Sequence, residues 1–142
     1  MRSMGNARAV GVGVIAAIVI VLATPRVWAT GWSPSAFATE RTLQLRTKCR
    51  AERERWSRER FVVVDGLMYI RLSSRMAARV QCNATAPFLG VEVAGQRFDH
   101  VLGVPAPPGR AGRVAKAMAD KYISDIVVRL FSHPLTLQLI AW

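Results

Sequence analysis

Two β-prone runs on either side of an Asp-Gly pair constrain the fold of this chain more than any other feature. Phe61–Asp65 is apolar and β-branched up to the aspartate, and Leu67–Leu72 is again apolar. Asp65-Gly66 lies between them, and such a pair between two β runs is the strongest short-range signal of a hairpin, because its turn needs positive φ angles. The centre of the chain is therefore predicted to form an antiparallel strand pair.

A second hairpin is predicted between Phe88–Ala94 and Arg97–Val104, with Gly95-Gln96 as its turn. Glu92 and Asp99 alternate with apolar neighbours in these runs. Alternation of this kind is typical of an antiparallel sheet with one solvated face. Two consecutive hairpins favour an antiparallel sheet or a small barrel.

The segment from Arg110 to about Phe131 is the best predicted helix, because apolar residues recur every four positions from Val114 onward. Its wide apolar face predicts that it packs against the sheet. His133-Pro134 is expected to end this helix. Leu135–Ile140 alternates between apolar and polar residues and predicts a closing strand.

The segment from Glu40 to about Glu59 is rich in Arg and Glu, and its residues favour a peripheral basic helix. Thr30–Thr39 contains Gly, Pro and Ser and is predicted to be a linker. The predicted domain therefore covers residues 40–142. Its predicted fold class is mainly β with helices: a small antiparallel barrel that carries a long packed C-terminal helix.

Residues 1–29 are predicted to be a transmembrane anchor or a signal segment. Ala9–Pro25 carries no charge, and Arg2 and Arg8 precede it. An uncleaved single-pass anchor in the membrane is the first interpretation. Cleavage after Val27-Trp28-Ala29, which would release a secreted domain, is the alternative. The arrangement slightly favours an exported domain.

The net charge of +11 does not by itself identify a partner. Nucleic acid is not predicted, because the chain has neither clustered aromatic residues for base stacking nor a recognisable reader motif. The densest basic run, Arg50–Arg60, could contact anionic lipids or form a solvated helix with paired Glu and Arg side chains. Only two cysteines and two histidines are present, so no metal site is predicted.

Cys49 and Cys82 are 33 positions apart and leave two interpretations open. In an exported domain they would form a disulfide that ties the basic segment to the barrel. In a cytoplasmic domain they would be small buried side chains.

The run Phe61–Arg75 resembles the first hairpin of the split β-barrel flavoproteins, which include pyridoxamine-phosphate-oxidase-like and deazaflavin-dependent reductase-like proteins. Val91–His100 is similar to the second hairpin of that group, and Ala117–Tyr122 is similar to its helix that ends in Lys-Tyr. The resemblance covers about residues 61–140. It implies a split barrel of about six strands, although only five are evident. The segment Val80–Cys82 is a candidate for the sixth.

The resemblance also implies a cofactor, either FMN or a deazaflavin, and a homodimer. The positions that match the phosphate-binding segment of the group are Arg71, Ser73, Ser74, Arg75 and Arg79. Arg forks and Ser hydroxyls suit phosphate oxygens. One departure is that Met76 stands where many members have lysine.

Two functions remain open from the sequence. The first is a membrane-anchored or exported oxidoreductase that uses a flavin or deazaflavin on an unknown small-molecule substrate. The second is a non-catalytic anchored domain that binds a partner protein or anionic lipid. No complete set of acid, base and nucleophile is evident, which keeps the second function open.

Overall fold

The computed structural model describes residues 31–122 and 135–142, so the predicted anchor or signal segment 1–29 lies outside the described residues. The strands are β1 (Thr42–Thr47), β2 (Arg55–Val64), β3 (Leu67–Leu72), β4 (Phe88–Val93), β5 (Gln96–Pro105) and β6 (Leu135–Ala141). The helices are the short 3-10 helix η1 (Pro34–Phe37), α1 (Ser74–Gln81) and α2 (Pro108–Lys121). Within the described residues, no helix is long and apolar enough to cross a membrane.

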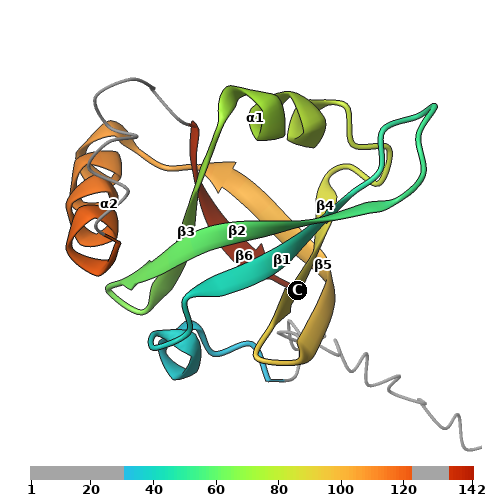
Figure 1. Cartoon of the computed structure of the whole chain (residues 1–142). Coiled ribbons are helices and arrows are strands. Elements are labelled where there is room, and N and C mark those ends of the chain that lie inside the picture. The colour runs from blue at the N-terminus through green and yellow to red at the C-terminus, as the bar shows by residue number, and fades with distance from the viewer. Residues whose placement is uncertain (1–30, 123–134) are drawn as a thin grey trace, which may run out of the picture.

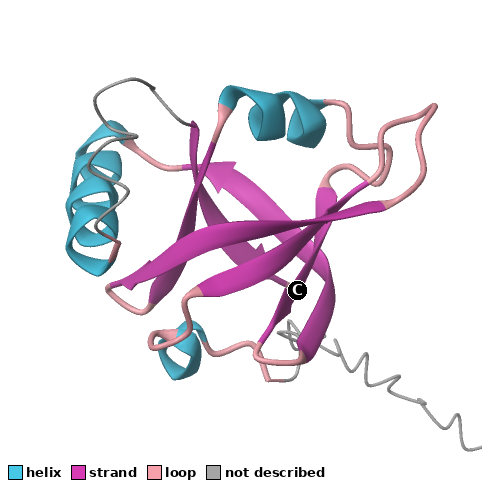
Figure 2. Ribbon diagram, in the orientation of Figure 1, coloured by secondary structure: helices cyan, strands magenta, loops and turns pink. Residues whose placement is uncertain are grey.

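The six strands close into one antiparallel barrel in the order β1-β2-β3-β6-β5-β4 (Figure 2). Both predicted hairpins are confirmed as β2–β3 and β4–β5, and the predicted closing strand is β6. In the first turn Asp65 and Gly66 have φ angles of 52° and 74°, as the Asp-Gly signal requires. The second turn is Ala94-Gly95 instead of the predicted Gly95-Gln96, because Gln96 already pairs with Val93.

The predicted basic helix over residues 40–59 is wrong. These residues form β1, a loop, and the first half of β2 (Figure 1). In β1 the side chains of Leu43, Leu45 and Thr47 are buried and those between them are partly exposed, which is the two-residue period of a strand. Only one face of this strand pair is buried, so basic side chains of the segment such as Arg46 and Arg58 are accommodated on the other face.

β1 is also the sixth strand that the predicted barrel lacked. It pairs with β2 on one side and with β4 on the other, and this pairing closes the barrel. The segment Val80–Cys82, the sequence-based candidate for that strand, instead forms the end of α1 and its C-cap. This helix runs for eight residues.

α1 covers one end of the barrel, where Met76 and Val80 pack on its core, and η1 lies at the opposite end (Figure 1). The segment predicted as a linker contains η1, whose Phe37 is 3% exposed. The rings of Trp32 and Phe37 pack edge-on against Phe98, with centroid distances of 4.9 and 6.2 Å. Residues just before the first strand therefore contribute to the core.

α2 packs against the outer face of the barrel beside β2 and β3 (Figure 1). The buried residues of this second cluster are Val62, Tyr69, Val114, Met118 and Tyr122. The predicted long helix is confirmed as far as Lys121, and Tyr122 already has an extended backbone with φ −131° and ψ 110°. The remainder of the predicted helix, and His133-Pro134, lie outside the described residues.

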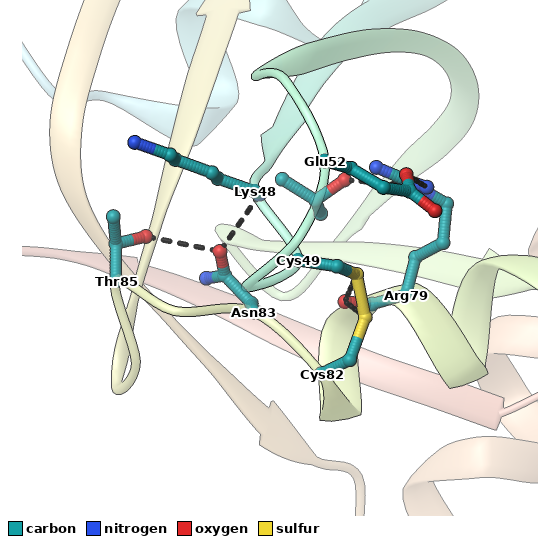
Figure 3. Close-up of a disulfide and its surroundings, with 8 residues drawn as sticks. Lys48, Cys49, Glu52, Arg79, Cys82, Asn83 and Thr85 are labelled. Carbon is teal, nitrogen blue, oxygen red and sulfur yellow. Dashed lines mark hydrogen bonds and ion pairs between the residues drawn. A yellow bond between two sulfur atoms is a disulfide. The ribbon is translucent and has the colours of Figure 1, made fainter.

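A disulfide joins Cys49, in the loop after β1, to Cys82, the C-cap of α1, with their Cα atoms 5.1 Å apart (Figure 3). Beside it, the backbone N–H of Lys48 donates to Oδ1 of Asn83 at 3.0 Å. The amide nitrogen of Asn83 donates to the carbonyl oxygen of Phe88 at 2.9 Å. The disulfide and these hydrogen bonds link β1, α1 and the start of β4.

We expect replacement of both cysteines by serine to destabilise the fold by about 3–4 kcal/mol, because the bond closes a long loop in the unfolded chain. Urea unfolding of the two proteins, followed by circular dichroism, measures this difference. Two free thiols in denatured, unreduced native material, together with an unchanged unfolding midpoint in the double variant, would contradict it.

Candidate anion-binding site

The alternation of β2 sets which side chains surround the candidate site. Glu59 pairs with Leu43 of β1, whose side chain is 2% exposed, so Glu59 lies on the inner face of this strand pair. Arg58 and Arg60 flank Glu59 and therefore lie on the outer face. One short segment thus presents two arginines outside and one carboxyl group inside.

A pocket of about 250 Å³ lies at the rim where β2, β3, α1 and α2 meet. Its lining residues are Arg58, Glu59, Arg60, Arg71, Ser73, Met76 and Met118. We call it the rim pocket. Three of these side chains are cationic and two are thioethers, so the pocket combines positive charge with a soft apolar wall.

Arg71 and Ser73, two of the five predicted phosphate-binding residues, both line the rim pocket. Ser73 is the N-cap of α1, and its Oγ accepts a hydrogen bond from the backbone N–H of Met76 at 3.3 Å. Because the hydroxyl acts there as an acceptor, its own proton can be donated to a ligand. Ser74 and Arg75 are exposed on the first turn of α1 and are not among the lining residues.

Arg79, the fifth predicted residue, lies elsewhere: it is 9% exposed and points toward the loop after β1 (Figure 3). Its Nε donates to Oγ1 of Thr47 at 3.2 Å, and its Nη1 lies 2.6 Å from Oε2 of Glu52. The Arg79 guanidinium holds the pKa of Glu52 below its ordinary range by hydrogen bonding and by charge. Arg79 thus supports the disulfide-linked loop and does not line the rim pocket.

Sequence reasoning missed Arg58, Glu59 and Arg60, because it placed them on a helix. Had 55–60 been read as a strand, the two-residue spacing of Arg58 and Arg60 would have put them on one face next to the predicted hairpin. The sequence therefore contains the spacing that brings Arg58 and Arg60 together, but this spacing is informative only if the segment is assigned as a strand.

Burial raises the pKa of Glu59 to about 7. Desolvation penalises the charged carboxylate, so Glu59 exchanges a proton near neutral pH. The other charged residues that line the rim pocket are Arg58, Arg60 and Arg71. Carboxyl groups whose pKa is shifted strongly by burial are found often at functional sites.

The Lys-Tyr pair at the end of α2 fixes the helix to the barrel. The ammonium of Lys121 lies within hydrogen-bonding distance of the carbonyl oxygens of Ala38, Glu40 and Phe61. The hydroxyl of Tyr122 lies 2.6 Å from the carbonyl oxygen of Arg41 and 2.7 Å from that of Phe61. Across the described ranges, no group of three or more His, Cys, Asp or Glu side chains could hold a metal ion.

No family model and no curated protein matches this sequence. Solved structures do match the fold. A protein described as a domain-swapped dimer superposes with a TM-score of 0.58 at 9% identity, over 70% of this chain and 80% of that chain. An F420-H2 dependent reductase superposes with a TM-score of 0.57 at 9% identity, over 71% of this chain and 94% of that chain.

The heme storage protein HutZ from Vibrio cholerae superposes with a TM-score of 0.57 at 19% identity, over 76% of this chain and 87% of that chain. At identities this low, the superpositions establish the fold but do not identify a ligand. The neighbours themselves differ, because one is described as a reductase and another as a heme storage protein. The likeness and the closed six-stranded barrel confirm the predicted split β-barrel fold.

Proposed function

We propose that this protein binds a flavin or a deazaflavin, with the cofactor phosphate in the rim pocket, and acts as a small oxidoreductase. The observation that carries the proposal is that Arg71 and Ser73 line one pocket together with Arg58 and Arg60. These side chains come from two strands and from the cap of a helix. Their convergence agrees with the phosphate-binding role that the sequence resemblance implies for Arg71 and Ser73.

The chemistry of the pocket fits this type of cofactor. Guanidinium groups bind phosphate oxygens through paired, charge-assisted hydrogen bonds, and the Ser73 hydroxyl adds another donor. The N-terminus of α1, which Ser73 caps, adds the positive end of the helix dipole. The thioethers of Met76 and Met118 offer a polarizable surface for a flat ring. The cofactor, when bound, supplies hydride transfer.

We also propose an exported or membrane-anchored location, with residues 1–29 as the export signal or the single-pass anchor. The uncharged run after a basic start supports this proposal, and so does the Cys49–Cys82 disulfide, because disulfides persist mainly in oxidising compartments. A homodimer is proposed as well. One structural neighbour is described as a domain-swapped dimer.

A non-catalytic domain that binds anionic lipid is the second candidate function. The specific observation in its favour is the cationic outer face of β2, to which Arg58 and Arg60 contribute. Juxtamembrane cationic side chains bind anionic lipid surfaces at about 1 kcal/mol each.

The first test is a cofactor titration of the purified full chain in mild detergent. We expect FMN or a deazaflavin to bind with a change in absorbance or fluorescence. Arg71→Lys should weaken binding about tenfold, because an ammonium cannot reproduce a guanidinium fork. Arg97→Lys is the matched control, since the exposed Arg97 lies on β5 and pairs with the partly exposed Glu92.

Failure of FMN, FAD and deazaflavin to bind would overturn the proposal. Saturable binding to phosphatidylserine vesicles by the same preparation would then favour the second function. Binding that neither substitution weakens would show that positive charge, which lysine retains, and not the guanidinium fork in the rim pocket, attracts the cofactor.

The second test uses the pH dependence of stability. The pKa of Glu59 is about 7 in the folded chain, above its ordinary value of 4.5, so the folded state holds more protons between these values. The contribution of Glu59 to the free energy of unfolding is therefore complete below about pH 4.5 and is lost as pH rises through 7. Glu59→Gln should raise the urea midpoint relative to the wild type at pH 8 and raise it less at pH 5.

Glu54→Gln, on the exposed loop before β2, is the control for loss of one carboxylate. An equal effect of Glu59→Gln at both pH values would show that burial does not perturb this carboxyl group.

A further inference from the structure

A second pocket, of about 390 Å³, lies beside the rim pocket on the outer face of β1 and β2. Its lining residues are Arg41, Thr42, Arg58, Arg60 and Tyr122. We call it the arginine pocket. Arg58 and Arg60 line both pockets, so a ligand in one lies next to a ligand in the other.

Strand register and an aromatic floor build the arginine pocket. Thr42 pairs with Arg60 across the two strands, which brings the start of β1 next to the middle of β2. Tyr122 is 2% exposed, and its hydroxyl is fixed against the carbonyl oxygens of Arg41 and Phe61. The floor of the pocket is therefore a rigid ring rather than a mobile surface side chain.

Two of the guanidinium groups are positioned by that ring. The guanidinium carbon of Arg41 lies 5.6 Å from the centroid of Tyr122, and that of Arg60 lies 5.4 Å from it. Cation–π attraction at these distances helps to hold side chains that would otherwise sample many rotamers. Ordering them in advance lowers the entropy cost of binding a ligand.

The charge around the arginine pocket is predominantly positive. Within the described residues, its lining contains three arginines and no carboxylate. Next to it, burial and then the charge of Arg41 lower the pKa of Lys121, while Glu40 acts in the opposite direction. Like charges gathered in a partly enclosed site repel one another and focus a field that attracts anions.

We propose that the arginine pocket binds the carboxylate or phosphate group of the substrate. This inference rests on the proposed function and deepens it, because it assigns the substrate class: a small molecule that carries an oxyanion. The arginines would hold the anionic end of that molecule, while its reacting part extends over Arg58 and Arg60 toward the rim pocket. Planar guanidinium groups suit both carboxylate and phosphate, which they bind in paired hydrogen bonds.

The test is calorimetric titration of the full chain in mild detergent with inorganic phosphate and, separately, with succinate. We expect both anions to bind and Arg41→Gln to weaken binding at least about tenfold, the loss of one charge-assisted contact. Arg53→Gln, in the exposed loop after β1, removes the same charge and should leave binding within about twofold, as expected for an exposed charge. Equal midpoints of thermal unfolding confirm that both variants are folded.

Cofactor titration of the same variants separates this inference from the proposed function, because Arg41 lines the arginine pocket and does not line the rim pocket. Arg41→Gln should leave FMN or deazaflavin binding within about twofold, whereas Arg71→Lys should weaken it. Anion binding that depends on Arg41, in a protein that binds none of these cofactors, would contradict the proposed function and leave the anion site standing.

Vesicles distinguish a soluble anion from a lipid headgroup as the source of the phosphate. Binding to phosphatidylserine vesicles that Arg41→Gln abolishes, with no binding of free phosphate or succinate, would overturn the assignment of a small-molecule substrate. The absence of Arg41-dependent binding to every probe would overturn the site itself.

Discussion

Closure of the barrel is the constraint on which the rest of this structure depends. β1 pairs with β2 on one side and with β4 on the other, so every strand of the barrel has a neighbouring strand on both sides. Once the ladder is closed, the pleat determines which side chains face the core and which face solvent. Arg58 and Arg60 of β2 lie on the outer face, where their guanidinium groups remain hydrated. The cationic outer surface beside α2 is a consequence of this closure.

The candidate sites follow from the same geometry. α2 packs on the outer face of β2 and β3 through Val62, Tyr69 and Met118, and the ends of this packed cluster meet the arginines of β2. The rim pocket forms where α1 begins beside this cluster, and the arginine pocket forms where α2 ends. Glu59 lies on the opposite face of the same strand, where burial raises its pKa. Burial and charge in both pockets are therefore set by strand alternation and helix packing.

Much of the fold could be predicted from local signals. The Asp65-Gly66 turn and the closing strand needed only turn chemistry and a two-residue period. The basic segment 40–59 could not be assigned in this way, because a strand with one solvated face can carry the same Arg and Glu residues as an exposed helix. What decided it was pairing with β4, more than forty residues away, and no local pattern reports such a contact.

The candidate site shows the same division. Arg71 and Ser73 follow a hairpin that was recognised, and they do line the rim pocket. Arg79 sits on the same stretch of sequence, but the helix directs it toward Glu52 and the disulfide-linked loop, an orientation that depends on where β1 ends. Arg58 and Arg60 were not recognised as site residues because the segment before the first hairpin was expected to be helical and is a strand. Ser74 and Arg75, which follow the same hairpin directly, do not line the rim pocket, so closeness to the motif alone does not decide which side chains converge there.

The proposed cofactor site depends on the rim pocket holding the phosphate of a flavin or deazaflavin. A crystal structure of the chain with FMN or a deazaflavin bound tests it most directly. We expect phosphate oxygens within hydrogen-bonding distance of the Arg71 guanidinium and the Ser73 hydroxyl, beside Met76. A phosphate bound away from both residues, with the rim pocket filled only by water, would contradict it.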